Sequence, residues 1–259
     1  MFAVATMVKD EEPRMKEWLI HYIKQGCSHF FIIDNGSTDK LRESLQGFPV
    51  TLVEDPRRFD ARTQARLLTE HVLPMVHYYE WVIVCDVDEY FYATEGTVKD
   101  ALSELRPEVR RVWVPWKIFG SNGHLTQPES LVKGFTRRAA RASLPYERVK
   151  TGYVPHLGVG KSINRTKGLT WLSPHEAGHE PPSILFLSDG TPAHLAKQPH
   201  AGKLRLNHYM LQSEAYYRDV KCKRGGGESG LVPKYTMAFF HEEDLKSNEV
   251  EDTELSGNA

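Results

Sequence analysis

Apolar and polar positions follow two different rhythms along the first 116 residues. Short runs of consecutive apolar residues, typical of strands that are buried on both faces, occupy 2–8, 29–33, 50–53 and 81–85. Between them, apolar residues recur at helical spacing over 15–23 and 60–77. Strands that alternate with helices through short links predict a mainly parallel sheet with helices on both faces and right-handed crossovers. We therefore expect a Rossmann-like α/β fold.

Polar residues follow directly on these apolar runs. Because the carboxyl ends of parallel strands meet at one edge of a sheet, and ligands bind beyond those ends in open α/β sheets, the polar residues should converge. The pattern therefore predicts a binding site at this edge. The residues concerned are Lys9, Asp10, Glu11, Asp34, Asn35, Glu54, Asp55, Asp86 and Asp88.

The run from Trp81 to Cys85 stops at two carboxylates that are separated by one residue. In extended backbone the side chains of Asp86 and Asp88 would point to the same side, with Cα atoms about 6 to 7 Å apart. Two hard oxygen donors at this spacing can share one divalent cation, and magnesium or manganese held in this way keeps positions for water and substrate phosphates. The alternative interpretation is a solvated acidic turn that caps the next element.

The length of 259 residues allows one large domain with a substantial core. We expect a single domain over residues 1–241, with a first half at 1–116 and an elaborated second half at 117–241. Residues 242–259 carry seven acids, one lysine and few apolar residues, a composition that predicts a disordered acidic tail.

The charge and cysteine content narrow the function classes. A formal net charge of −1 argues against a nucleic-acid binder, and three cysteines without paired spacing suit a reducing compartment. No apolar run reaches the length of a transmembrane span and the first residues lack signal-peptide features, so we expect a cytoplasmic protein. The segment 133–167 holds nine basic residues and one acid, so we expect it to contact an anionic partner. The candidates are the acidic edge, a phosphorylated ligand, and the cytosolic face of a membrane in peripheral contact.

A second candidate chemistry lies at His175-Glu176-Ala177-Gly178-His179, which matches the His-Glu-x-x-His zinc signature. That chemistry needs a helix to bring both histidines onto one face. Pro174, Gly178 and the Pro181-Pro182 pair oppose a helix here. A zinc metallohydrolase is therefore the alternative function.

Taken together, several motifs resemble glycosyltransferases of the A-type fold, closest to family 2 and family 92-like enzymes, over roughly residues 3–222. The joint pattern is more specific than any one motif. It consists of Val8-Lys9-Asp10-Glu11 followed by Glu17-Trp18-Leu19-Ile20-His21-Tyr22; Ile33-Asp34-Asn35-Gly36-Ser37-Thr38-Asp39; the 81–91 segment; Trp116 to Gly120; Lys161-Ser162; and Asn207-His208-Tyr209.

The resemblance implies a metal-dependent transferase of glycan biosynthesis, in which 1–116 would be the nucleotide-sugar-binding half and 117–241 the acceptor and diphosphate half. A nucleotide-diphosphate sugar, with a UDP-sugar as the expected donor, would pass its sugar to a glycan or other hydroxyl acceptor with manganese or magnesium bound. A non-catalytic nucleotide-sugar or carbohydrate-binding protein of the same fold is a further interpretation. By the same resemblance Thr6 and Lys9 would line the nucleotide pocket, and Asp34 would contact the base or the ribose. Asp86 would bind both the ribose and the metal, Asp88 would be the firmer metal ligand, and His208 would be the third ligand. Lys161 would face the diphosphate.

An inverting enzyme needs a carboxylate to accept the proton of the acceptor hydroxyl. Glu129, Glu147, Glu176 and Asp189 are all candidates, and no motif distinguishes them. We select Glu176, because the neighbouring His175 follows Lys161 at a distance usual for these families. We expect an inverting outcome, and a retaining mechanism stays open.

Overall fold

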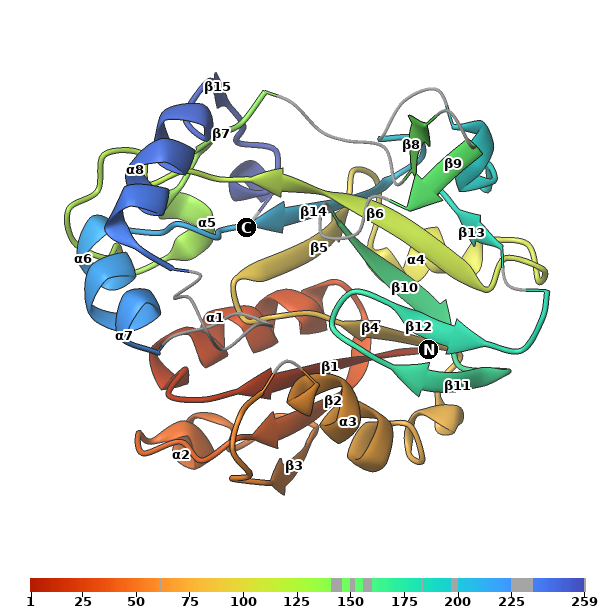
Figure 1. Ribbon diagram of the computed structural model, residues 1–259. Coiled ribbons are helices and arrows are strands. Elements are labelled where there is room, and N and C mark those ends of the chain that lie inside the picture. The colour runs from red at the N-terminus through yellow and green to blue at the C-terminus, as the bar shows by residue number, and fades with distance from the viewer. Residues whose placement is uncertain are drawn as a thin grey trace. The chain divides into compact units, whose positions relative to one another are not determined.

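The computed structural model describes residues 1–60, 62–140, 146–149, 152–155, 160–182, 184–196, 200–224 and 235–258 (Figure 1). The chain divides into two compact units. The first comprises 1–59, 63–116 and 142–206, and the second comprises 60–62, 117–141 and 207–259. The boundary expected after residue 116 is thus one point where the chain passes from the first unit to the second. The segment 142–206, which was expected in the second half, returns to the first unit.

The first unit is built on a nine-stranded sheet with the order β3-β2-β1-β4-β10-β6-β14-β5, and β13 pairs with β6. Strands β1 to β4 are parallel, and β10 runs antiparallel to both β4 and β6. The predicted α/β class with a mainly parallel central sheet is confirmed. The strands are β1 (Phe2–Val8), β2 (Cys27–Asp34), β3 (Val50–Glu54), β4 (Trp81–Val84), β5 (Glu89–Ala93), β6 (Arg111–Ile118), β10 (Gly160–Arg165), β13 (Leu185–Phe186) and β14 (Leu204–His208).

The helices of the first unit connect these strands. The segment expected to be one helix over 60–77 begins at Thr63, continues as π-helix from residue 68 and ends in a 3-10 turn. Two small antiparallel strand pairs, β8–β9 and β11–β12, lie outside the main sheet. The elements are α1 (Glu12–Lys24), α2 (Leu41–Ser44), α3 (Thr63–Leu67), the π-helix Leu68–Val72, the 3-10 helix Val76–Tyr78, α4 (Val98–Ser103), β8 (Tyr146–Val149), β9 (Gly152–Pro155), β11 (Leu169–Leu172), β12 (Ala177–His179) and the 3-10 helix Ala193–Leu195.

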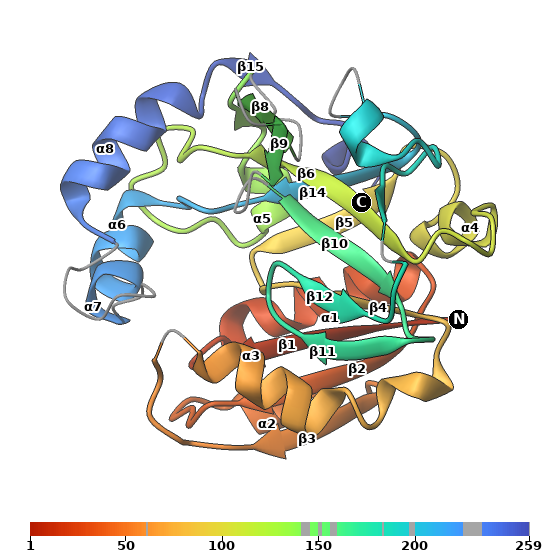
Figure 2. The ribbon, with the colours of Figure 1, turned by 45° about the vertical axis from the view of Figure 1, so that its right-hand side comes forward.

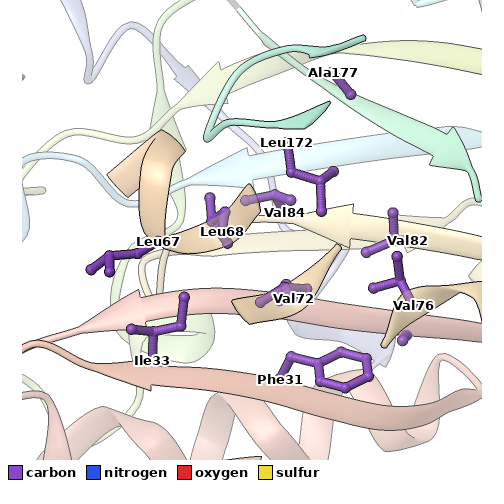
Figure 3. Close-up of a cluster of buried hydrophobic side chains, with 12 residues drawn as sticks. Phe31, Ile33, Leu67, Leu68, Val72, Val76, Val82, Val84, Leu172 and Ala177 are labelled. Carbon is purple, nitrogen blue, oxygen red and sulfur yellow. The ribbon is translucent and has the colours of Figure 1, made fainter. Parts of the chain in front are cut away.

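Alternating residues of β2 show how the two faces of the sheet are covered. Phe31 and Ile33 pack in a buried cluster with Leu68 and Val72 from the segment that continues α3 (Figure 3). Phe30 points to the opposite face, where its ring lies 5.6 Å from that of Trp18 on α1. Helices therefore cover both faces, with α1 and α3 on opposite sides (Figure 2).

The second unit contains the C-terminal segment, and here one prediction is wrong. The disordered tail predicted for 242–259 is not found over the described residues 242–258, because Val250 and Glu251 pair with Arg138 and Arg137, and Asp252 forms buried ion pairs. The elements of this unit are α5 (Leu131–Gly134), β7 (Arg137–Arg138), α6 (Glu214–Tyr216), the π-helix Tyr217–Lys221, α7 (Cys222–Arg224), α8 (Met237–Lys246), β15 (Val250–Glu251) and the 3-10 helix Ser256–Asn258.

Among the residues that the structure describes, no helix is both long and apolar enough to cross a membrane.

Candidate active site

The order β3-β2-β1-β4 creates a topological switch point between β1 and β4, because the chain leaves β1 in one direction across the sheet and later returns to its other side. In doubly wound sheets ligands bind outside the carboxyl ends of the strands at such a point. Lys9 and Asp10 follow β1, and Asp86 follows β4, so they flank the switch point. Asp34 ends β2 and pairs in register with Val8. The structure thus brings the predicted acidic edge together in the first unit.

The loops after β1 and β2 are tied to each other by side chains. Asp10 adopts a left-handed backbone (φ 54°), and its carboxylate accepts hydrogen bonds from the backbone and the hydroxyl of Thr38, at 2.7 and 3.1 Å. The backbone N–H of Asp10 donates to the hydroxyl of Ser37 at 3.0 Å. One carboxylate oxygen of Asp34 accepts the Ser37 N–H at 2.7 Å. These bonds fix the two loops where a nucleotide is expected.

Asp86 and Asp88 lie in a tight turn, not in extended backbone as expected. Strand β4 ends at Val84, and the N–H of Glu89 donates to the Asp86 carbonyl at 3.1 Å, which closes a four-residue turn. The indole N–H of Trp18 lies 3.2 Å from the carbonyl oxygens of both Asp86 and Glu89. The Asp-x-Asp segment is therefore held at both of its ends.

A buried ion cluster stands behind this turn. The ammonium of Lys161, from β10, lies 2.6 Å from Glu89 Oε2 and 3.0 Å from Asp86 Oδ2. The side chains of Lys161 and Glu89 are both 0 % exposed, whereas that of Asp86 is 41 % exposed. Glu89 Oε2 also accepts the Asp86 N–H at 2.8 Å, and Glu89 Oε1 accepts the indole N–H of Trp116 at 2.9 Å. Asp86 thus reaches solvent while its inner oxygen faces a buried cation.

Opposing effects set the protonation of this cluster. Burial raises the pKa of Glu89, Lys161 opposes this shift and favours the ionised carboxylate, and the charges of Asp86 and Asp88 add to the shift. Burial by itself would lower the pKa of Lys161, but Asp86 and Glu89 outweigh burial and raise it well above its usual value. Lys161 is therefore a charged ammonium at neutral pH.

The remaining predicted nucleotide-binding residues differ in exposure. Lys9 is exposed at the edge, and Asp34 is partly buried. Thr6 is completely buried within β1, and its hydroxyl has no hydrogen-bond partner in the part of the chain that the structure describes. Thr6 therefore lies beneath the edge, not on its surface.

His208 belongs to the second unit. It ends β14, and its carbonyl accepts the N–H of Phe119 at 3.0 Å. Its role as a third metal ligand stays a prediction. Within the described ranges, no group of three or more His, Cys, Asp and Glu side chains is arranged to hold a metal ion.

The His-Glu-x-x-His interpretation is wrong. Residues 177–179 form β12, paired with β11, and not the helix that a zinc site of this type requires. Glu176 precedes this strand in a turn, where its N–H donates to the hydroxyl of Ser173 at 3.1 Å. The structure thus places Glu176 in the first unit, and its role as general base stays a prediction.

Three of the six basic side chains that the structure describes in the segment 133–167 form ion pairs. Arg138 pairs with Asp252, Lys161 with Asp86 and Glu89, and Arg165 with Glu80. Arg141 and Lys150 lie outside the described residues, as does the side chain of Arg148. The membrane contact stays a prediction that these pairs do not support.

Glu89 and Trp116 were not identified as site residues from the sequence. The signal available in the sequence was a glutamate at the start of an aromatic run, Glu89-Tyr90-Phe91-Tyr92. In the structure every residue of β5 is buried. A charged residue at such a position requires a partner. That partner, Lys161, is 72 residues away along the chain and could not be identified from sequence spacing.

Sequence comparisons relate this chain to known proteins. A sequence model described as Glycosyltransferase family 92 matches residues 1–254. A glycosyltransferase family 92 protein from Oryza sativa subsp. japonica is 24 % identical over 262 residues, which cover 95 % of this chain and 38 % of the rice protein. The chain thus spans well under half of that relative.

Two solved structures are similar in part. HddC from Yersinia pseudotuberculosis is 10 % identical with a TM-score of 0.36, over 81 % of this chain and 90 % of that chain. An active-site mutant of LgtC is also 10 % identical with a TM-score of 0.36, over 98 % of this chain and 100 % of that chain. At these values neither likeness bears on function. The match over nearly the whole sequence decides the identity: the chain belongs to glycosyltransferase family 92.

Proposed function

We propose that this chain transfers a sugar from a nucleotide-diphosphate sugar, with a UDP-sugar as the expected donor, to a hydroxyl group of a glycan or other acceptor. The observation that carries the proposal is the Asp86–Glu89 turn at the carboxyl end of β4, beside the switch point of the sheet. Family membership supports the reaction class.

The donor set at this edge suits magnesium or manganese. Asp86 and Asp88 offer hard carboxylate oxygens, and the side chain of Asp86 is 41 % exposed. Two carboxylates are enough for such an ion, because it completes its coordination with water and substrate phosphates. When bound, it would stabilise the negative charge of the departing nucleoside diphosphate.

The protein side chains have separate roles in this proposal. Lys9 and Asp34 bind the nucleoside, with Thr6 beneath them, and Asp86 serves ribose and metal. Lys161 is buried against Asp86, so its charge favours the diphosphate from behind the turn.

Glu176 accepts the proton of the acceptor hydroxyl in a single inverting displacement. The anomeric configuration of the product tests the inverting outcome, since inversion requires one direct attack by the acceptor.

The decisive experiment compares wild type with Asp88→Asn in a nucleoside-diphosphate release assay, after thermal-shift screening of nucleotide-sugars with manganese has identified the donor. We expect turnover to fall about 100-fold or more, because removing one charge that stabilises the transition state costs about 3 kcal/mol. Asp219→Asn is the control, since Asp219 is exposed and, among the residues that the structure describes, pairs with the surface residues Arg218 and Lys223.

Two results would contradict the proposal. Full turnover by Asp88→Asn would show that Asp88 is not a metal ligand. Donor binding by the wild type without release of nucleoside diphosphate would instead indicate a binding protein of the same fold.

A further inference from the structure

Glu89 occupies an unusual position, because it is the first residue of β5 and its side chain is completely buried. Its surroundings consist of hydrogen-bond donors: the indole of Trp116, the backbone N–H of Asp86 and the ammonium of Lys161, at 2.9, 2.8 and 2.6 Å. Because these neighbours only donate, both side-chain oxygens of Glu89 must accept hydrogen bonds. An ionised carboxylate fits this requirement. Nothing in the proposed reaction uses this group directly.

The contacts of Glu89 join three separate parts of the first unit. Asp86 lies in the turn after β4, Trp116 on β6 and Lys161 on β10. The carboxylate closes the turn a second time, since Asp86 and Glu89 are already joined by the backbone bond from Glu89 N–H to the Asp86 carbonyl. It also holds the Lys161 ammonium where it reaches Asp86 Oδ2.

We propose that Glu89 is a positioning residue for the metal and donor site: it locks the Asp86–Glu89 turn and, through Lys161, orients the Asp86 carboxylate before the ligand arrives. This inference rests on the proposed function. It assigns to Glu89 no contact with substrate.

The physical reason is the conformational entropy that the Asp86 side chain loses when it is fixed in one rotamer. Asp86 is partly exposed, and without Glu89 and Lys161 its side chain would sample several rotamers, so that binding would have to fix one of them. A partner that orients a metal ligand in advance removes that cost, and losing such a partner commonly lowers metal affinity about 10- to 100-fold.

Glu89→Gln provides the sharpest perturbation. The amide keeps the size of the side chain but replaces one acceptor oxygen by an NH₂ donor, which must face Trp116, Lys161 or the Asp86 N–H. We expect the Kd for Mn²⁺, measured by electron paramagnetic resonance with UDP present, to rise about tenfold or more. Hydrogen exchange of the Asp86 amide in metal-free protein should also become faster, because its acceptor is weakened.

Asp252→Asn is the matched control. Asp252 is another buried carboxylate with two cationic partners, but it lies in the second unit. It should lose stability while leaving both the Mn²⁺ affinity and the Asp86 exchange rate unchanged. If Glu89→Gln does not fold, the double variant Glu89→Gln/Lys161→Met replaces it, because removing both members of a buried ion pair is tolerated better than removing one.

The outcomes separate this inference from the proposed function. A Glu89→Gln or double variant that binds Mn²⁺ within twofold of wild type and protects Asp86 equally overturns the positioning role. Wild type that fails to bind Mn²⁺ with UDP contradicts the metal dependence instead, and the exchange of Asp86 in metal-free protein then still decides the role of Glu89.

Discussion

The stability of the folded C-terminal segment should depend on a single buried carboxylate. The side chain of Asp252 is 6 % exposed, and it accepts from Lys117 Nζ at 2.9 Å and from Arg138 Nε at 2.5 Å. Breaking a buried ion pair costs about 3 to 5 kcal/mol when the other charge is left uncompensated. In Asp252→Asn, Lys117 keeps Glu254 at 2.7 Å and the amide keeps one acceptor, so the expected loss is lower, about 2 kcal/mol.

The assay is urea unfolding followed by circular dichroism, together with hydrogen exchange over residues 237–258. Burial raises the pKa of Asp252, but hydrogen bonds from Arg138 and Lys117 outweigh burial and lower it below its usual value. The stability it contributes is therefore present above a pH of about 4 and is lost as the pH falls further. The difference between wild type and variant should shrink over that range.

Glu242→Gln is the control, because Glu242 and Lys246 form a solvent-exposed pair one helical turn apart, and such surface pairs contribute little to stability. Asp252→Asn with wild-type stability and unchanged protection of residues 237–258 would refute the reasoning. It would mean that apolar packing, such as that of Phe240 with Leu211 and Tyr217, holds the segment without the ion pairs.

Two smaller predictions concern α1. Burial lowers the pKa of His21 to about 4, so the wild type should lose stability as the pH falls from about 6.5 towards 4, and His21→Gln should lose less over this range in parallel thermal melts; an identical pH dependence would contradict the neutral buried form. Gly26 ends the turn after α1 at φ +85°, and an added Cβ would lie 2.7 Å from Lys99 Cβ. Gly26→Ala should therefore destabilise the protein by about 1 to 2 kcal/mol in chemical denaturation. Unchanged stability would show that the turn relaxes.

The strands of the first half could be predicted from sequence because their signals are local. The run 81–85 is apolar at every position and 2–8 at every position but Thr6, and this pattern distinguishes a strand buried on both faces from a surface strand. Alternation with helices then fixed the parallel direction, and hence the edge at which Asp34 and Asp86 meet. Extended backbone was expected at Asp86 and a turn was only the alternative interpretation, because an apolar run shows where a strand begins more clearly than how it ends.

The C-terminal segment shows the limit of composition. Its many acids predict disorder when charges are only counted, but Asp252 has Lys117 and Arg138 as partners, both more than 100 residues earlier in the chain. Pairing of this kind offsets the cost of burying charge, and no local pattern records it.

The sequence by itself determined the family, the α/β class and the acids of the sheet edge, since these follow from residue type and short-range periodicity. Only the tertiary structure decided that Glu89 is buried against Lys161 and that Asp86 lies in a closed turn. The reason is physical: a carboxylate at the start of a strand has the same local pattern whether it faces water or an ammonium, and only the packing of β5 and β10 in one sheet brings the two charges together.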